Sequence, residues 1–533
     1  MPPEDKAREL ISGFFANCGH VHPYIHEGRF MDTYEEVRRS NYTRVRRSWL
    51  ALLYIMFSVA SKSWPYSSAN LIASDAEADA WYKAASEICL QLAYSDSGVT
   101  LEVIQCLVTM VLYLQGTHSS KELWVMLGLA VRLAYQLGLH SAEACKATDP
   151  IEAEVRRRVW AGLILLDRIL SMTMGRPPEI PDYQWSMGRP QPFLDSVQRG
   201  CIQRDESSVS FLCANLDLYS ILGRTIESLY GRNCGSRIPF NVDSIAKVYT
   251  LESDLLQWSK GLSSELSVME VDEIPQEPVS FREPMEIFSR RQKTVITLRY
   301  LNARILVHRP ILEGLLDVTL SSNPDVTNLK LMRQAGANSV SLAVNCAVKT
   351  IRIVHRLVSG TTQSQQQLGA WWFTLYWTFN SALVLLGGLL VSRPQLDCPE
   401  LLAQTDRTSA CQALQQALEV FDLHDEGHST VIRCREYLYD LIRIAGPLTS
   451  SNGDAAFQNS ISVADNTNPY NGAAFGAQNI PSINNLQQPN VPAMRSSPFR
   501  QLANDIDLES FMFPTVDMQS FGGQLVGMEQ PFL

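Results

Sequence analysis

The chain has 533 residues, of which 46% are hydrophobic and 19% charged, and its net charge is −10. This hydrophobic content is typical of a globular protein, and the length exceeds that of one ordinary domain. The acidic balance excludes a chain whose whole surface binds nucleic acid. The eleven cysteines lie singly, with no C-x2-C pair, and the N-terminal residues are too polar for a signal peptide. We therefore expect buried thiols in a reducing compartment and no zinc finger in this chain.

Residues 1–11 are interpreted as an N-terminal extension, and residues 12–30 combine an aromatic pair, a His-Pro step and three histidines. The histidines and the acid beside them are His20, His22, His26 and Glu27. Imidazoles at this spacing can converge on a metal ion. Alternatively, the segment is a loop that docks its rings against the helices. We favour the docking loop, because no regular element fixes a ligand geometry here.

Apolar periodicity predicts helices over residues 33–61, 76–93 and 101–116. Five arginines lie between Arg38 and Arg47, and such a run can bind phosphates. Because an apolar stretch follows at once, we interpret the run as a solvated helix end.

The pattern Ser119-x-x-Glu122 predicts a capping box that opens a helix over residues 123–137, which Gly138 ends. In this capping box, the serine side chain bonds a backbone N–H of the first turn. The glutamate side chain then bonds the backbone of the serine.

The next helix is the most specific part of the sequence. Asp149 and Pro150 predict its beginning, and Gly175 predicts its end. Its charges need partners if they are buried. We expect Glu154 to pair with Arg157 or Arg158, and Asp167 to pair with an arginine of a neighbouring helix. Ligand binding by these charges is the alternative to a structural ion network.

The later part of the chain is also predicted to be helical, which makes the fold class all-α. We expect an acidic connector over residues 265–284, interpreted as a mobile surface loop, and a long helix over 285–308 that ends before Pro310. Residues 368–391 carry no charge and are long enough to span a membrane; we favour a buried core helix. The remaining helices are predicted near residues 209–231, 241–262, 338–358, 369–391, 407–423 and 429–444.

Residues 449–533 are rich in Asn, Gln, Ser, Gly and Pro, so we predict a disordered tail. Within the segment 505–513, acids alternate with large apolar side chains, an arrangement that suits an activation segment bound by a co-activator groove. The apolar side chains are Ile506, Leu508, Phe511 and Phe513. An inert tail is the alternative.

An ordered set of residues marks the central helix and the turn after it. The set comprises Glu154, Arg156, Arg157, Arg158, Trp160, Asp167, Arg168, Gly175, Arg176, Pro177 and Asp182, with His308, Arg309 and Pro310 further along. It resembles the signature of the fungal-specific transcription factor domain, the middle regulatory region of fungal zinc-cluster transcription factors. The resemblance assigns residues 12–448 to that regulatory domain.

The resemblance implies a nuclear transcriptional regulator, with or without a cytoplasmic share, rather than an enzyme. Its implied partners are co-activators or other transcription proteins and a second subunit in a homo- or heterodimer; no membrane is implied. The six-cysteine cluster of the family is missing from this sequence, so DNA would be reached indirectly or through another module, and zinc is expected only with that module. The alternative is a metabolite-binding or catalytic helical protein built on the same domain.

Overall fold

The structure is a computed structural model. It describes residues 1–62, 74–95, 99–117, 119–145, 149–182, 188–196, 199–231, 242–274, 284–319, 326–392, 401–424 and 429–449. Across these residues the chain forms helices and loops and no β-strand, which confirms the all-α prediction. The segment 505–513, with Ile506, Leu508, Phe511 and Phe513, lies outside the described residues.

The helices follow one another in chain order with few irregular interruptions. They are α1 Glu4–Phe14, α2 Glu27–Arg39, α3 Arg47–Lys62, α4 Asp75–Ala93, α5 Leu101–Gln115, α6 Ser120–Gln136, α7 Ala142–Cys145, α8 Pro150–Met174, α9 Ile202–Leu229, α10 Val242–Lys260, α11 Pro284–Thr319, α12 Val326–Val358, α13 Thr362–Gln365, α14 Trp371–Val391, α15 Gln404–His424 and α16 Ser429–Thr449. A π-helical turn, η1 Phe15–Gly19, continues α1, and a 3-10 turn, η4 Val271–Glu273, precedes α11.

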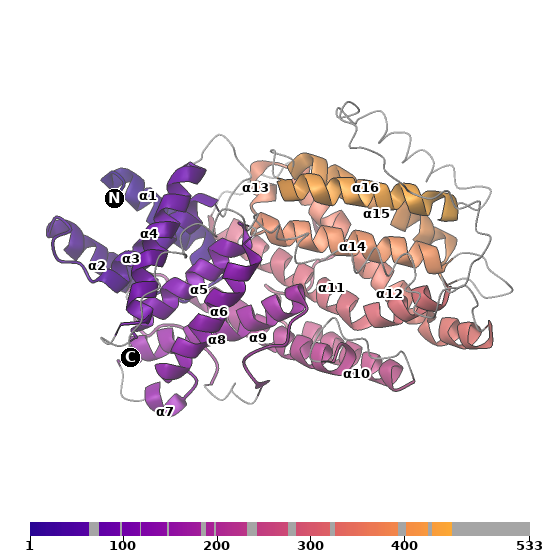
Figure 1. The fold of residues 1–533 in the computed structure, drawn as a ribbon, viewed down its shortest axis with the longest axis horizontal. Helices are drawn as coiled ribbons and strands as arrows, with labels where there is room; N and C mark the ends of the chain where they lie inside the picture. The colour runs from indigo at the N-terminus through magenta and orange to yellow at the C-terminus, as the bar shows by residue number, and fades with distance from the viewer. Residues whose placement is uncertain are drawn as a thin grey trace, which may run out of the picture.

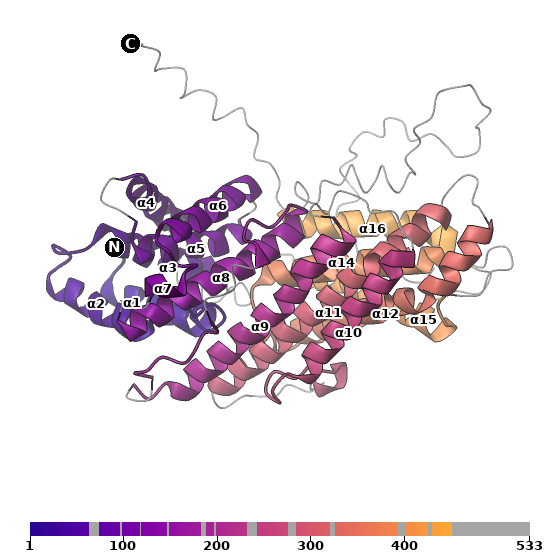
Figure 2. The same cartoon turned by 90° about the horizontal axis from the view of Figure 1, so that it is seen from below.

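Helices α1–α8 gather on one side of the molecule and α9–α16 on the other (Figures 1 and 2). We call these groups the N-terminal half and the C-terminal half. In the N-terminal half, α3 packs against α1, α4 and α5; in the C-terminal half, α12 packs against α11, α14 and α15. Helices α8 and α9 pack together and connect the halves.

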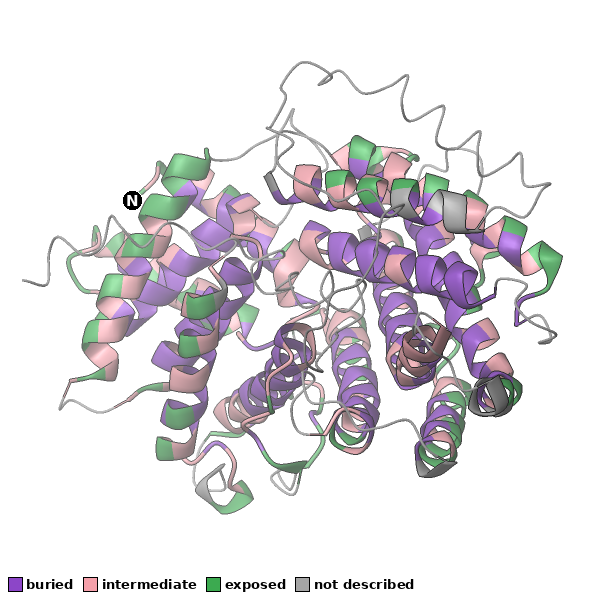
Figure 3. Ribbon diagram, turned by 45° about the vertical axis from the view of Figure 1, so that its right-hand side comes forward, coloured by how far each residue is buried: buried purple, intermediate pink, exposed green. Residues whose placement is uncertain are grey.

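Helix α14 is buried along almost its whole length, as Figure 3 shows. It is long and apolar enough to cross a membrane, but 94% of its most apolar window is buried inside the protein. A helix that is apolar on all sides is stable in the middle of a large helical protein. The structure thus places residues 371–391 in the core, as the sequence interpretation favoured.

The helix predicted over residues 33–61 is in fact two helices, α2 and α3. The chain leaves the helical conformation between them at Asn41 and Tyr42, which have φ angles of 54° and 59°. A left-handed backbone cannot continue a right-handed helix. The hydrophobic pattern missed this break because apolar and aromatic residues recur on both sides of it.

The prediction that a helix ends before Pro310 is wrong, because α11 continues through this proline to Thr319. Proline lacks the N–H that would donate to the carbonyl four residues earlier. That carbonyl, on Leu306, instead accepts a hydrogen bond of 2.7 Å from the hydroxyl of Tyr230, the residue that follows α9. A side chain from another helix thus satisfies the carbonyl that the proline leaves unpaired.

The capping box predicted at Ser119 does not form. Ser119 precedes α6, but its side chain makes no capping hydrogen bond. The Glu122 carboxylate instead accepts a 2.5 Å hydrogen bond from the Tyr82 hydroxyl of α4. Helix α6 begins at Ser120. Glu122 connects α6 to α4 and does not cap the beginning of α6.

The first described residues of the predicted connector 265–284 are packed rather than mobile, and this corrects the surface-loop interpretation. Leu266, Met269 and Ile274 are buried, and the Val271 carbonyl accepts a 2.5 Å hydrogen bond from Arg356 of α12. Residues 275–283 lie outside the described part of the chain.

The predicted boundary between an N-terminal extension and the helical domain falls inside α1. Ala7, Leu10 and Ile11 of this helix are almost completely buried, and α1 packs against α3. The first residues of the chain therefore contribute to the core of the N-terminal half.

Candidate functional site

Helix α8 begins and ends as its sequence predicts. The Asp149 side chain accepts a 3.1 Å hydrogen bond from the backbone N–H of Glu152, and Pro150 is the first helical residue. Gly175 closes the helix with a φ angle of 65°, which a residue with a side chain rarely adopts. The Glu152 carboxylate bonds Arg156, one turn along the helix, at 3.0 Å.

A first ion cluster lies near the beginning of α8. Glu154 contacts both arginines that were predicted as its alternatives: Arg158 at 3.0 Å, and Arg157. It also accepts a 2.8 Å hydrogen bond from the backbone N–H of Gln191. Arg158 is only 1% exposed and forms a second ion pair, at 2.8 Å, with Asp205 of α9. The cluster thereby joins α8, the loop before α9 and α9 itself.

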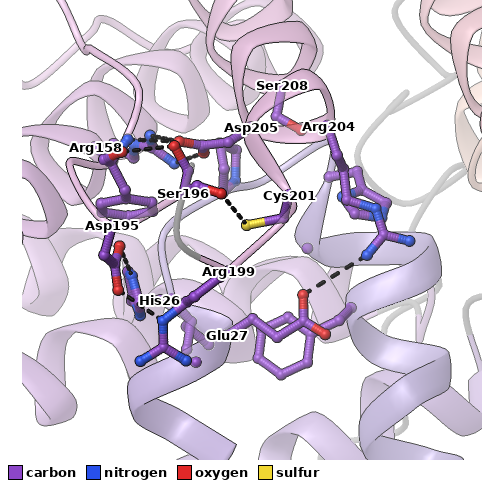
Figure 4. A pocket seen from close by; sticks show the side chains of 17 residues that line it. His26, Glu27, Arg158, Asp195, Ser196, Arg199, Cys201, Arg204, Asp205 and Ser208 are labelled. Carbon is purple, nitrogen blue, oxygen red and sulfur yellow. Dashed lines mark hydrogen bonds and ion pairs between the residues drawn. The ribbon is translucent and has the colours of Figure 1, made fainter.

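Arg158 leaves little capacity for a ligand, although it lines a pocket of about 70 Å³ (Figure 4). Besides its two carboxylates, it donates a 2.7 Å hydrogen bond to the Gln191 carbonyl. The Phe193 ring centroid lies 3.7 Å from its guanidinium carbon, within the range of a cation–π contact. The buried charge is thus satisfied by the protein itself.

The other charged side chains of this pocket are also paired with one another. Asp195 accepts hydrogen bonds from His26 at 3.0 Å and Arg199 at 2.7 Å, and the pair of Arg204 with Glu27 is longer, at 3.8 Å. Cys201 lies among them and its thiol donates to the Ser196 carbonyl at 3.5 Å; burial is the main cause that raises the pKa of this thiol. A raised thiol pKa disfavours a nucleophilic thiolate.

The loop between η1 and α2, residues 20–26, which we call the entry loop, contains three histidines with three different sets of partners. The His20 ring packs edge-on against Phe288, and His22 shares a 3.2 Å hydrogen bond with the Tyr24 hydroxyl. Burial is the main cause that lowers the pKa of His20 and His22 to about 3, so both rings are neutral at physiological pH. In the part of the chain that the structure describes, no three His, Cys, Asp or Glu side chains are grouped to hold a metal ion.

The same loop docks directly against α8. A Cβ atom added to Gly162 would lie 2.3 Å from the Tyr24 ring, closer than any real contact, so glycine lets the loop approach the helix. The Tyr24 carbonyl accepts a 2.7 Å hydrogen bond from Gln105 of α5. These contacts are those of a docking loop.

A second ion cluster lies near the end of α8. Asp167, which is completely buried, accepts hydrogen bonds from the backbone N–H groups of Glu179 at 2.9 Å and Ile180 at 3.0 Å. Arg168 donates to Asp167 at 2.6 Å, to the Ile180 carbonyl at 2.7 Å and to Asp182 at 2.6 Å. Burial raises the pKa of the Asp167 carboxyl, although the two amides and Arg168 act in the opposite direction.

The expectation that Asp167 pairs with an arginine of a neighbouring helix is therefore wrong. Its arginine is the next residue, and its remaining partners are backbone amides. The chain reverses after Gly175, so the segment 179–182 folds back over the helix that it has just left. Arg168 also lies against α9, because its Nε atom is 3.0 Å from the position of a Cβ added to Gly223.

Other residues of the predicted set pack around α8 without joining the two clusters. Trp160 is 1% exposed, and its ring packs edge-on against Tyr135 with a centroid distance of 5.3 Å. The Arg176 guanidinium lies 4.9 Å from the centroid of the Trp124 ring of α6. Pro177 is exposed at the turn that follows Gly175.

The second predicted motif, at residues 308–310, forms a separate group in the C-terminal half. His308 is fully buried and shares a 3.2 Å hydrogen bond with Glu252 of α10. Arg304, one turn earlier on α11, donates to the same carboxylate at 3.1 Å. Arg309 bonds Glu313 at 2.7 Å on the same helix, and Pro310 follows within the helix.

Sequence reasoning missed the long-range partners in the first ion cluster and in the group around His308. Asp205 and Glu252 each lie 47 or more residues from the arginine or histidine that they bond, and no local spacing indicates them. Arg304 could have been found, because its separation of four residues from His308 places both side chains on one face of a helix.

Together, the fold and the buried clusters define a large all-α domain organised around one charged central helix. Residues 11–268, which contain α8 and both of its clusters, match the family model described as the fungal specific transcription factor domain. Over these residues the chain is therefore similar to that family.

The curated relatives of the chain carry names of transcription factors. It is 29% identical to Transcription factor FBD3 of Gibberella moniliformis, over 89% of this chain and 61% of the relative. It is 24% identical to Sorbicillinoid biosynthetic cluster transcription factor 2 of Penicillium rubens, over 71% and 53%. The ABC-transporter-regulating transcription factor of Aspergillus fumigatus is 22% identical, over 73% and 42%. The chain thus spans about three fifths or less of the length of these relatives.

Proposed function

We propose that the protein regulates transcription and that its helical part, residues 12–448, is the regulatory domain. The observation that carries this proposal is the family match over residues 11–268. The names of the relatives support it, and they do not favour the alternative of a metabolite-binding or catalytic protein that is not a regulator. A regulator of transcription acts in the nucleus. A fluorescent fusion of the chain should therefore locate there.

Within this proposal, DNA is contacted indirectly or through a module other than these 533 residues. The basic run at residues 38–47 is partly paired with acids of the same chain: Arg38 bonds Glu35 at 3.0 Å, and the exposed Arg46 bonds Glu102 at 2.5 Å. Few arginines of the run are left for phosphates, and phosphate contacts dominate the affinity for DNA. The isolated chain should therefore bind duplex DNA weakly and with strong salt dependence. Tight, sequence-specific binding in a titration would contradict this part.

A further prediction concerns zinc bound to the chain. We expect the purified chain to hold no stoichiometric zinc, because His20, His22 and His26 contact different neighbours and the cysteines lie singly in the sequence. Elemental analysis that finds one tightly bound zinc ion per chain would contradict this expectation.

The partners proposed here are co-activators or other transcription proteins, and a second subunit in a homo- or heterodimer. The tail supplies the co-activator segment: when the chain is tethered to a heterologous DNA-binding domain, it should activate a reporter. Replacement of Ile506, Leu508, Phe511 and Phe513 by alanine should abolish that activation. The matched control replaces Phe521 and Phe532, which lie outside the segment. Equal loss in both variants, or a silent wild-type fusion, would contradict the proposed activation segment.

A further inference from the structure

A cavity of about 50 Å³ lies where the N-terminal half meets the C-terminal half. Its walls come from the loop after η1, from α3 and α5, and from α11 and the beginning of α14. It is separate from the pocket of Figure 4, which lies between the entry loop, α8 and α9. One water needs about 10–15 Å³ of such space, so the cavity has room for several non-hydrogen atoms.

Gln115, the last residue of α5, lines this cavity with an amide that has no partner. Its side chain is 6% exposed, and neither its nitrogen nor its oxygen finds a hydrogen-bond partner among the described residues. Leaving a buried donor and acceptor unsatisfied is costly. The contrast with Gln105 is direct, because that residue lies on the same helix, is also 6% exposed, and donates a 2.7 Å hydrogen bond to Tyr24.

Arg299 of α11 brings a buried positive charge to the same cavity. It is 6% exposed, donates to the neutral amide of Asn215, and lies against the Phe211 and Tyr219 rings at 5.8 and 5.7 Å. Within the described part of the chain it has no carboxylate partner, whereas Arg158 and Arg168, which are each 1% exposed, have two. A buried charge without a counter-ion is unfavourable.

A second arginine and several apolar side chains complete the site. Arg291, about two helical turns before Arg299, donates a 2.7 Å hydrogen bond to the Gln366 carbonyl, and burial lowers its pKa to about 10. The apolar walls include Leu112, Trp372 and Phe373. A neighbouring cavity of about 30 Å³ is also lined by Gln115, Trp372 and Phe373, so these three side chains separate two spaces.

We propose that the cavity binds a small organic monocarboxylate with a short apolar group. The carboxylate would pair with Arg299 and accept a hydrogen bond from the Gln115 amide, and the apolar group would lie against Trp372 and Phe373. Charge-assisted hydrogen bonds in a water-poor site make the site specific for such an anion. The cavity volume limits the ligand to a few carbon atoms.

The position of the cavity gives such a ligand a regulatory consequence. Gln115 belongs to the N-terminal half, whereas Arg299 and Trp372 belong to the C-terminal half, so a bound anion contacts both. It therefore stabilises the arrangement in which the halves are closed against each other. This consequence rests on the proposed function in transcription, whereas binding itself does not.

The test uses isobutyrate as the probe and isobutyramide as its uncharged counterpart of the same shape. Titration calorimetry and thermal unfolding are measured on the full chain with both compounds. We expect saturable binding of isobutyrate with a raised midpoint of unfolding, and binding of isobutyramide that is at least about tenfold weaker, since a hydrogen bond to a charged group is worth that factor or more.

Gln115→Met and Arg299→Lys locate the site. Gln115→Met keeps the side-chain length and removes an unsatisfied amide, so the free protein should be as stable as wild type or more stable. Its affinity for isobutyrate should fall about tenfold. The matched control Gln105→Met should lower the midpoint of unfolding, because a satisfied hydrogen bond is lost, and should leave isobutyrate binding unchanged.

Three results would overturn the proposal: no saturable binding of isobutyrate, equal binding of isobutyramide, or unchanged binding in both Gln115→Met and Arg299→Lys. The first would mean that the cavity holds water only. The reporter fusion described above, with and without isobutyrate, tests the regulatory consequence. A silent fusion with intact isobutyrate binding would contradict the proposed function and not the binding site.

Discussion

Arg168 and Arg299 are both almost fully buried, but their surroundings are opposite. Arg168 lies between two aspartates and a backbone carbonyl, whereas Arg299 has one neutral amide and two aromatic rings. A buried charge is tolerated when the protein supplies its counter-charge. The comparison separates two uses of buried arginine: Arg168 holds the chain together, and Arg299 is left with capacity for a ligand.

The largest effect is expected when Arg168 loses the carboxylate of Asp167. Asp167→Ala leaves the buried guanidinium with the Ile180 carbonyl and the half-exposed Asp182 carboxylate, and it removes the acceptor of two backbone amides. We therefore expect a loss of about 3–5 kcal/mol in the free energy of unfolding. Denaturant titration measures it. The control is Asp182→Ala, whose side chain is 48% exposed; this change should cost no more than about 1 kcal/mol. Equal effects of the two changes would mean that Asp167 is not the essential partner.

Truncation of a buried aromatic side chain on the same helix measures the contribution of packing to stability, for comparison with that of the charge pair. Trp160→Ala removes the largest fully buried side chain and should cost about 3–5 kcal/mol in the free energy of unfolding. Thermal and denaturant unfolding should agree on this value. A near-wild-type stability together with lost reporter activity would instead assign the region a binding role.

A smaller effect is expected for a helix carbonyl whose hydrogen-bond donor is a side chain distant in the sequence. Tyr230→Phe removes the hydroxyl that bonds the Leu306 carbonyl, and we expect a loss of about 1–3 kcal/mol in stability. Pro310→Ala restores the missing helical N–H. In a double-variant cycle it should therefore recover most of the loss, and the absence of any recovery would show that the hydroxyl acts elsewhere.

The smallest expected effect concerns Glu252 and the pH dependence of stability. Burial works to raise the pKa of this carboxyl, but the hydrogen bonds from His308 and Arg304 outweigh it and lower the pKa below 4.5. A lowered pKa contributes stability above pH 4.5, which is lost as the pH falls below that value. Glu252→Gln should therefore flatten the decrease in stability on the acid side, as measured by unfolding between neutral pH and pH 3. The exposed control Glu9→Gln should retain the wild-type slope.

Some features of this protein can be predicted from local sequence. The fold class and most helices follow from apolar periodicity, and the ends of α8 follow from Asp149, Pro150 and Gly175. The contacts of Glu154 with Arg157 and Arg158 were predicted because residues three and four apart meet on a helix. These inferences succeed because their cause lies within one turn of the chain.

The rest was decided by tertiary structure. Nothing near Asp167 in the sequence indicates that the backbone of residues 179 and 180 returns to it, and nothing near Pro310 indicates the hydroxyl of Tyr230. The cavity at Gln115 and Arg299 is lined by residues that are 184 positions apart in the chain. Its capacity to bind an anion depends on an amide that has no hydrogen-bond partner among the described residues. Local sequence specifies which groups need a partner, and only the packing of distant helices determines whether each group finds one.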